Sequence, residues 1–208
     1  MATLQTLNIG GRVAELGVVP GSAGLVMFCH PNGGNRTHQR SQHVARRLQH
    51  RGLSTLLLDL LTADEAALPD ALDDIDLLTR RVLQAIDALP TPQRHLPLGL
   101  FGADSGGAAA LVADTRLPHG AGAVVSRSGR LELAGSALAE VRAPTLLIVG
   151  GADPDAVESN RRAYARLRCE KRIEIMPRTS HHFLEAGALD RAATSAGDWF
   201  CAHLPRPR

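Results

Sequence analysis

Most of the information about the architecture lies in the segment Phe101-Gly102-Ala103-Asp104-Ser105-Gly106-Gly107-Ala108. An apolar run that predicts a strand ends at Phe101, and a run of small residues that predicts a helix starts after Asp104. The glycines allow a strained turn between the strand and the helix, and they let the two pack closely. A strand, a tight turn and a helix in this order indicate a buried, mainly parallel sheet.

The tip of this turn is the position known as the nucleophile elbow, and two registers can occupy it. With Asp104 at the tip, a glycine stands two places before it and another two places after it. With Ser105 at the tip, the corresponding residues are Ala103 and Gly107. The apolar strand ends at Phe101, which favours Asp104, and Ser105 remains the alternative. A plain structural explanation is that Asp104 only caps the helix that follows.

Strand-like and helix-like segments alternate along the rest of the chain. Apolar runs and alternating patterns predict strands over residues 4–9, 12–16, 25–29, 54–61, 96–101, 121–126, 144–149 and 172–176. Apolar residues three and four apart predict helices over residues 39–51, 72–89, 105–113, 154–168 and 187–203. This order predicts a single α/β domain over residues 1–208, with an eight-stranded, mostly parallel sheet and helices on both faces.

Two further strand ends carry side chains that can act with Asp104. Asp153 and His181 each follow a predicted strand, and ligands of such sheets bind at the carboxyl ends of the strands. The chain order of Asp104, Asp153 and His181 is nucleophile, acid and histidine, the order that α/β-hydrolases use. Asp153 can also cap the helix that begins at Pro154, and His182 competes with His181 as the base.

The loop after the third predicted strand reads Cys29-His30-Pro31-Asn32-Gly33-Gly34-Asn35-Arg36. A loop at this place normally supplies one backbone N–H to an oxyanion, and the residue after the elbow, Ser105, supplies the other. Because Pro31 has no N–H, we expect Asn32 to be the partner donor. We expect His30 to brace this loop rather than to react.

The composition excludes several classes of protein. Hydrophobic residues make up 44% and charged residues 21% of the 208 residues, as in an ordinary globular domain. The net charge of +2 gives no basis for binding nucleic acid, and the longest apolar runs are strand-sized, too short to span a membrane.

The three cysteines, Cys29, Cys169 and Cys201, have no metal-ligand spacing and cannot all pair, and the N-terminus lacks the pattern of a signal peptide. We therefore expect a cytoplasmic protein with no cofactor and no metal. Its expected partner is a small-molecule substrate, with no nucleic acid and no membrane, and a homodimer is possible.

Four stretches carry a resemblance to a known family. They are residues 54–62 (STLLLDLLT), 99–103 (GLFGA), 124–127 (VVSR) and 144–151 (PTLLIVGG). Together the chain from about residue 18 to residue 203 resembles small α/β-hydrolases of the dienelactone-hydrolase-like group. The resemblance implies the α/β-hydrolase fold, with the nucleophile at Asp104, the acid at Asp153 and the base at His181.

The chain departs from that group at two places. The elbow usually carries serine or cysteine where Asp104 stands, and the first loop usually reads His-Gly where His30-Pro31 stands. The resemblance therefore implies the fold more firmly than it implies ester or lactone hydrolysis.

An aspartate at the elbow changes the expected chemistry. Its carboxyl group has an unperturbed pKa of about 3.9, so it is already ionised near neutral pH. Attack on an ester would give a high-energy mixed anhydride, whereas attack on an epoxide or a saturated carbon with a leaving group gives an alkyl ester. Water activated by His181 can then cleave that ester, with Asp153 orienting the imidazole. We therefore predict a hydrolase of small electrophiles, anionic ones included, with epoxide hydrolase-like chemistry.

Known enzymes of that type have catalytic residues that this chain lacks. Dehalogenases usually have tryptophan after the aspartate, where Ser105 stands, and epoxide hydrolases use tyrosines of a cap domain. The one tyrosine, Tyr164, lies on a predicted helix outside the site, and the segment between Arg127 and Pro144 is too short for a cap. The remaining candidates to protonate a leaving oxygen are His30, Arg36, His38 and Arg127. Arg127 can also hold a substrate carboxylate.

Two other functions stay open. The first is a serine esterase or lactonase that uses Ser105. The second is a non-hydrolytic lyase or cyclase with Asp104 as general base, or a binding protein that has lost its nucleophile. The complete acid–histidine pair argues against pure binding.

Overall fold

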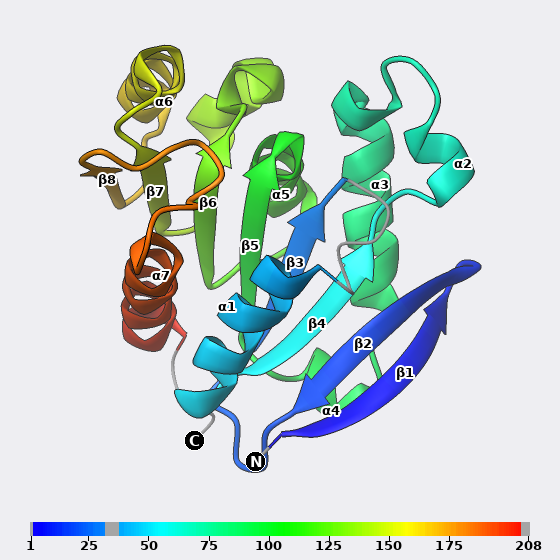
Figure 1. Cartoon of the computed structure of the whole chain (residues 1–208). Coiled ribbons are helices and arrows are strands. Elements are labelled where there is room, and N and C mark those ends of the chain that lie inside the picture. Colours follow the sequence, from blue (N-terminus) through cyan, green and yellow to red (C-terminus); the bar gives the residue numbers. More distant parts are fainter. Residues whose placement is uncertain (1, 32–37, 205–208) are drawn as a thin grey trace.

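The computed structural model describes residues 2–31 and 38–204. Within them, eight strands form one sheet in the order β1-β2-β4-β3-β5-β6-β7-β8 (Figure 1). The strands are β1 (Thr3–Ile9), β2 (Arg12–Val18), β3 (Leu25–His30), β4 (Ser54–Asp59), β5 (Leu98–Asp104), β6 (Ala123–Gly129), β7 (Thr145–Gly150) and β8 (Lys171–Met176). The β1–β2 and β2–β4 pairs are antiparallel, and all others are parallel. The predicted fold class is confirmed.

Helices cover both faces of this sheet. They are α1 (Gln39–His50), α2 (Ala63–Ala66), α3 (Ile75–Asp87), α4 (Thr91–Arg94), α5 (Ser105–Arg116), α6 (Pro154–Arg166) and α7 (Ala188–His203), with 3-10 helices η1 (Ala71–Asp73) and η2 (Leu131–Glu140). Apolar side chains of α1 and α7 pack on one face, and those of α3, α5 and α6 pack on the other. Figure 1 shows α1 and α7 in front of the sheet and α3 and α5 behind it.

The strand predicted over residues 96–101 runs instead from Leu98 to Asp104, and the helix predicted over residues 72–89 is also wrong in its extent. The chain forms η1 first, leaves helical geometry at Asp74 (φ −72°, ψ 84°), and begins α3 at Ile75. The Asp74 carboxylate accepts a hydrogen bond of 2.9 Å from the N–H of Leu77, so it caps the new helix. The short elements α2, α4 and η2 were not predicted.

The carboxyl ends of the parallel strands meet along one edge of the sheet. Between Ala103 and Asp104 the register of β5 against β6 shifts, and Asp104 pairs with Gly129. The segment between β6 and β7 holds only η2 and its flanking turns, so the described residues form no cap domain over this edge. In the described part of the chain, every helix is too short or too polar to cross a membrane.

A buried carboxylate fixes the connections around α5 and β6. Asp114 has no exposed surface, and it accepts hydrogen bonds from the backbone N–H groups of Ala121 (2.7 Å), Arg142 (2.8 Å) and Ala143 (3.2 Å). We expect Asp114→Ala to lower the free energy of unfolding by about 3 kcal/mol, because buried N–H groups would lose their acceptor. Urea unfolding measures this, with the exposed Asp87→Ala as the control, for which the expected change is below about 0.5 kcal/mol. Equal effects in the two variants would contradict the assignment.

Candidate active site

The turn between β5 and α5 has the geometry of a nucleophile elbow. Asp104 is the last residue of β5 and has φ 50° and ψ −134°, a strained conformation for a residue with a side chain. A Cβ on Gly106 would lie 1.9 Å from the carbonyl oxygen of Cys29, and one on Gly102 would lie 2.5 Å from the carbonyl oxygen of Gly106. Only glycine fits these two places, and the side chain left projecting at the tip is that of Asp104.

The structure brings the three candidate reactive residues together. His181 Nε2 lies 2.8 Å from Asp104 Oδ1, and His181 Nδ1 lies 3.3 Å from Asp153 Oδ2. The three side chains come from the ends of β5, β7 and β8, and each is partly exposed. His181, not His182, is the histidine in contact with Asp104, and the ring of His182 meets that of His181 edge-on at 5.1 Å between centroids.

Ser105 is turned away from this group. Its side chain is buried, and its hydroxyl donates a hydrogen bond to the backbone carbonyl of Leu72. Its backbone N–H belongs to the first turn of α5, where N–H groups have no partner within the helix. Ser105 therefore offers its N–H to a ligand beside Asp104, while its hydroxyl is engaged elsewhere.

The Asp104–His181 pair favours its charged form. Burial alone would raise the pKa of Asp104, but the hydrogen bond from His181 and the positive charges of His181 and Arg127 outweigh it and lower that pKa. The same hydrogen bond, with the charges of Asp104 and Asp153, raises the pKa of His181 against the effect of its own burial. Asp104 is therefore ionised at neutral pH, and His181 holds its proton to a higher pH than a free histidine.

Arg127 supplies a half-buried positive charge close to Asp104. Burial lowers the pKa of Arg127 to about 10, and the charge of Asp104 counteracts this, so the group is still a cation at neutral pH. Its guanidinium carbon lies 5.5 Å from the centre of the Phe183 ring. Its Nε atom is buried and has no hydrogen-bond partner among the described residues. Such a cation is suited to an anionic group of a ligand.

His30 lies at the end of β3 in an apolar setting. It is 6% exposed, it stacks on Phe28 with ring centroids 5.8 Å apart, and it meets the tilted ring of Phe101 at 6.0 Å. Burial, with the charge of Arg127 nearby, lowers the pKa of His30 to about 3. As a neutral imidazole it braces the strand end and is not a general acid near neutral pH.

The structure describes only some of the remaining candidate residues. Asn32 and Arg36 lie outside the described residues. His38 caps α1, with Nδ1 accepting a 3.2 Å hydrogen bond from the N–H of Arg40, and burial lowers its pKa. Arg40 was not predicted: its guanidinium donates to the carbonyl of His182 at 3.2 Å and adds positive charge near Arg127. The sequence places Arg40 in the first turn of the helix that follows the first loop, and this position could have indicated that its side chain lies near the site.

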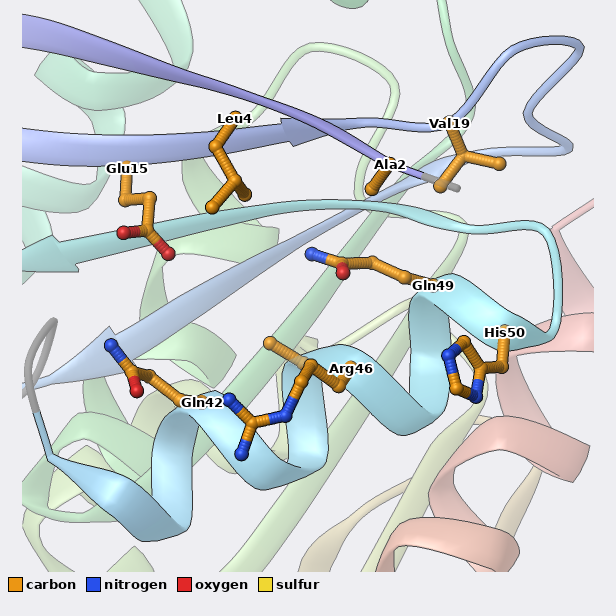
Figure 2. A pocket seen from close by; sticks show the side chains of 9 residues that line it. Ala2, Leu4, Glu15, Val19, Gln42, Arg46, Gln49 and His50 are labelled. Atoms are coloured by element: carbon orange, nitrogen blue, oxygen red, sulfur yellow. The ribbon is translucent and has the colours of Figure 1, made fainter.

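A cavity of about 600 Å³ lies away from these residues, between the β1–β2 hairpin and α1. Figure 2 shows Leu4 and Glu15 on the strands and Gln42 and Arg46 on the helix. None of the candidate reactive residues lines this cavity, so it is not the reaction centre.

Comparison with known proteins places the chain among enzymes of this fold. No protein-family model matches it. A dienelactone hydrolase from Anabaena variabilis, known from a crystal structure, is 42% identical in sequence to this chain. The two structures superpose over 98% of each chain with a TM-score of 0.89. The esterase Est1E from Butyrivibrio proteoclasticus, 12% identical with a TM-score of 0.78 over 96% of this chain and 98% of its own, shares the fold alone.

Two curated proteins match over a part of their length. They are putative phosphoribosyl transferases from two strains of Mycobacterium tuberculosis, each 42% identical over 186 residues. The match covers 88% of this chain, which spans only 42% of the length of these relatives. The match to the Anabaena enzyme extends over nearly the whole of both chains, and on that ground the chain belongs to the dienelactone hydrolase family of α/β-hydrolase-fold proteins.

Proposed function

We propose that the chain is a hydrolase of small electrophiles in which Asp104 forms an alkyl-enzyme ester, with epoxides as the favoured substrate class. The observation that carries this proposal is the 2.8 Å contact between Asp104 Oδ1 and His181 Nε2 at the tip of the elbow. A hydrolase follows from the family, and the carboxylate at the elbow favours attack on carbon over attack on an ester carbonyl.

In the first step, an oxygen of Asp104 attacks one carbon of the epoxide. A bond forms between that oxygen and the carbon, the carbon–oxygen bond of the ring breaks, and its electron pair goes to the leaving oxygen. In-line displacement puts the leaving oxygen on the far side from Asp104, so it takes its proton from solvent. The cationic guanidinium of Arg127 lies near Asp104 and is suited to hold a carboxylate of the substrate.

In the second step, water cleaves the ester. Alkylation makes Asp104 neutral, which removes the main cause of the raised pKa of His181. His181 then releases its proton to solvent, which balances the proton taken up by the leaving oxygen, and becomes a base for water. Hydroxide adds to the Asp104 carbonyl carbon, and the N–H of Ser105 stabilises the oxyanion. Collapse breaks the bond from this carbon to the alkyl oxygen, and the proton of the added hydroxyl passes to that oxygen, which releases the alcohol and restores the carboxylate.

A single turnover in heavy-oxygen water tests this route. We expect excess enzyme acting on a small epoxide carboxylate such as glycidate to put ordinary oxygen, taken from Asp104, into the product diol. Heavy oxygen should appear in Asp104 instead, as seen by mass spectrometry of the peptide that contains it. Heavy oxygen in the first-turnover product would mean that water attacks directly, which would favour the general-base role of Asp104.

The serine route has weaker support. The hydroxyl of Ser105 donates to the carbonyl of Leu72, and no contact joins it to His181. A serine nucleophile needs its proton removed by a base within hydrogen-bond reach. Esterase or lactonase activity through Ser105 would require the elbow to rearrange.

A further inference from the structure

The strand β8 forms one edge of the sheet (Figure 1). It pairs in parallel with β7 on its inner side, and in the described part of the chain no strand pairs with its outer side. An edge strand presents a row of unpaired backbone N–H and carbonyl groups, and these groups can pair with a strand of another chain. The residues of β8 therefore decide whether this edge attracts or repels a second strand.

The hydrogen bonds to β7 show which backbone groups of β8 point outward. The N–H of Thr145 donates a 2.9 Å hydrogen bond to the carbonyl of Glu170, and the N–H of Gly151 donates a 2.8 Å hydrogen bond to the carbonyl of Met176. Because alternate residues of a strand use their backbone groups on opposite sides, the even-numbered residues of β8 bond to β7. The residues with outward groups are Lys171, Ile173 and Ile175. The described residues give these outward groups no hydrogen-bond partner.

Two side chains of opposite charge stand on one face of this edge. Arg172 and Glu174 are two residues apart, so they point to the same face of the sheet, and they form an ion pair along the strand. Glu174 lines a cavity together with residues of α7, which places both side chains on the face that α7 covers. Lysine is the residue that most often protects an edge strand, but Lys171 points to the other face. There its Nζ donates hydrogen bonds to the carbonyls of Tyr164 (2.9 Å) and Leu167 (2.6 Å).

Two β8 strands can pair antiparallel in only a few registers. Outward backbone groups must meet outward groups, so odd-numbered residues must face odd-numbered residues. The registers that keep the middle of the strand paired are centred on Arg172, Ile173 or Glu174. A centre on Arg172 or on Glu174 places that residue opposite its own copy, and like charges directly opposite each other destabilise a pair of strands. A centre on Ile173 places Arg172 opposite Glu174 of the partner subunit, and it does so twice, so the strand is complementary to itself in this register.

We propose that the chain forms a dimer in which β8 pairs antiparallel with β8 of a second copy about a two-fold axis at Ile173. Ile173 exchanges both backbone hydrogen bonds with Ile173 of the partner subunit, and Lys171 does the same with Ile175 of the partner subunit. The outward N–H and carbonyl groups of the strand are then paired. The contact uses the same patch on both copies, so it closes on itself and gives a dimer rather than a chain of subunits.

A cavity beside β8 adds a place for a side chain of the partner subunit. Its volume is about 570 Å³, and it lies between β8 and α7, with Glu174, Ile175 and Met176 in its lining. Arg172 of the partner subunit, placed opposite Glu174, would lie over this cavity with its carbon stem against the apolar lining. An ion pair covered in this way is less screened by water and salt than an exposed one, so the cross-strand pairs contribute to association.

The mass of the full chain in solution tests the dimer. Sedimentation velocity over micromolar to millimolar concentrations should show a monomer of 22.1 kDa passing to a species of twice that mass. Arg172→Glu leaves only acidic side chains in the cross-strand pairs, and Glu174→Arg leaves only basic ones, so each dimer should dissociate at least about 100-fold more easily. Arg80→Glu, the same change at an exposed position of α3, is the matched control and should dimerise as the unmodified protein does.

Restored pairing distinguishes an effect across the interface from a local disturbance of β8. The double variant Arg172→Glu with Glu174→Arg should dimerise again, and a mixture of the two single variants should form a mixed dimer, because both place an acid opposite a base. Hydrogen exchange reads the register. The amide of Ile173 should exchange slowly in the dimer and fast in the monomeric variants, whereas the amides of Arg172 and Glu174, which bond to β7, stay slow in both.

A monomer at every concentration would overturn the proposal. A dimer that Arg172→Glu does not weaken would overturn it too, as would a dimer that forms without slowing the exchange of the Ile173 amide, since either would use another surface. Failure of both the double variant and the mixture to dimerise would exclude the register centred on Ile173. None of these measurements involves turnover, so they are independent of the heavy-oxygen experiment.

Discussion

Replacement of His181 by Gln yields a protein that reacts once and then stops. Displacement at carbon needs only the ionised carboxylate of Asp104, whereas cleavage of the resulting ester needs a base for water. We expect the steady-state rate to fall about 10³-fold or more, within the range that general-base catalysis contributes. We also expect the adduct to accumulate on the peptide that contains Asp104, where mass spectrometry detects it with a true substrate.

His182→Gln is the matched control for this experiment. His182 touches the ring of His181 but makes no contact with Asp104, so its variant should turn over at near the normal rate without a stable adduct. Equal losses in the two variants would indicate a general disturbance of the loop. A His181→Gln protein without an adduct would remove the covalent intermediate from the mechanism.

Replacement of Asp104 by Asn removes the nucleophile itself. Loss of a nucleophile in an assembled site costs about 10⁴-fold or more in kcat, because the other groups cannot substitute for it. We expect this loss with little change in unfolding, since the Asp104 side chain is partly exposed and its strained backbone is set by the glycines around it. Steady-state kinetics and urea unfolding measure the two effects.

Ser105→Ala distinguishes the aspartate route from the serine route. Its backbone N–H survives, so most activity should remain, and the lost hydrogen bond to Leu72 should affect mainly stability. An inactive Ser105→Ala protein beside an active Asp104→Asn protein would reverse the assignment and support the esterase or lactonase.

The register of the elbow was predictable because it is decided by local sterics. Gly102 and Gly106 are needed for close backbone contacts, and these contacts can be anticipated from the positions of glycines around Asp104. The sheet was predictable for a similar reason, since apolar runs of strand length alternate with helical periodicity. The break before α3 was missed because Asp74 can either continue a helix or cap one, and the side-chain bond to Leu77 decides it.

The sequence could not predict the surroundings of side chains whose neighbours come from distant parts of the chain. His30 is neutral because Phe28 and Phe101 stack around it, and those contacts form only in the folded sheet. The hydroxyl of Ser105 donates to the carbonyl of Leu72, which lies in η1 and is more than thirty residues away in the sequence.

The residues that hold the elbow in shape are not the residue that reacts. Gly102 and Gly106 are fixed by close backbone contacts, whereas the side chain at position 104 faces His181 and takes no part in those contacts. A lineage with this scaffold can therefore exchange the residue at the tip without redesigning the frame. The backbone geometry of the turn therefore does not depend on whether a carboxylate, a hydroxyl or a thiol stands at its tip.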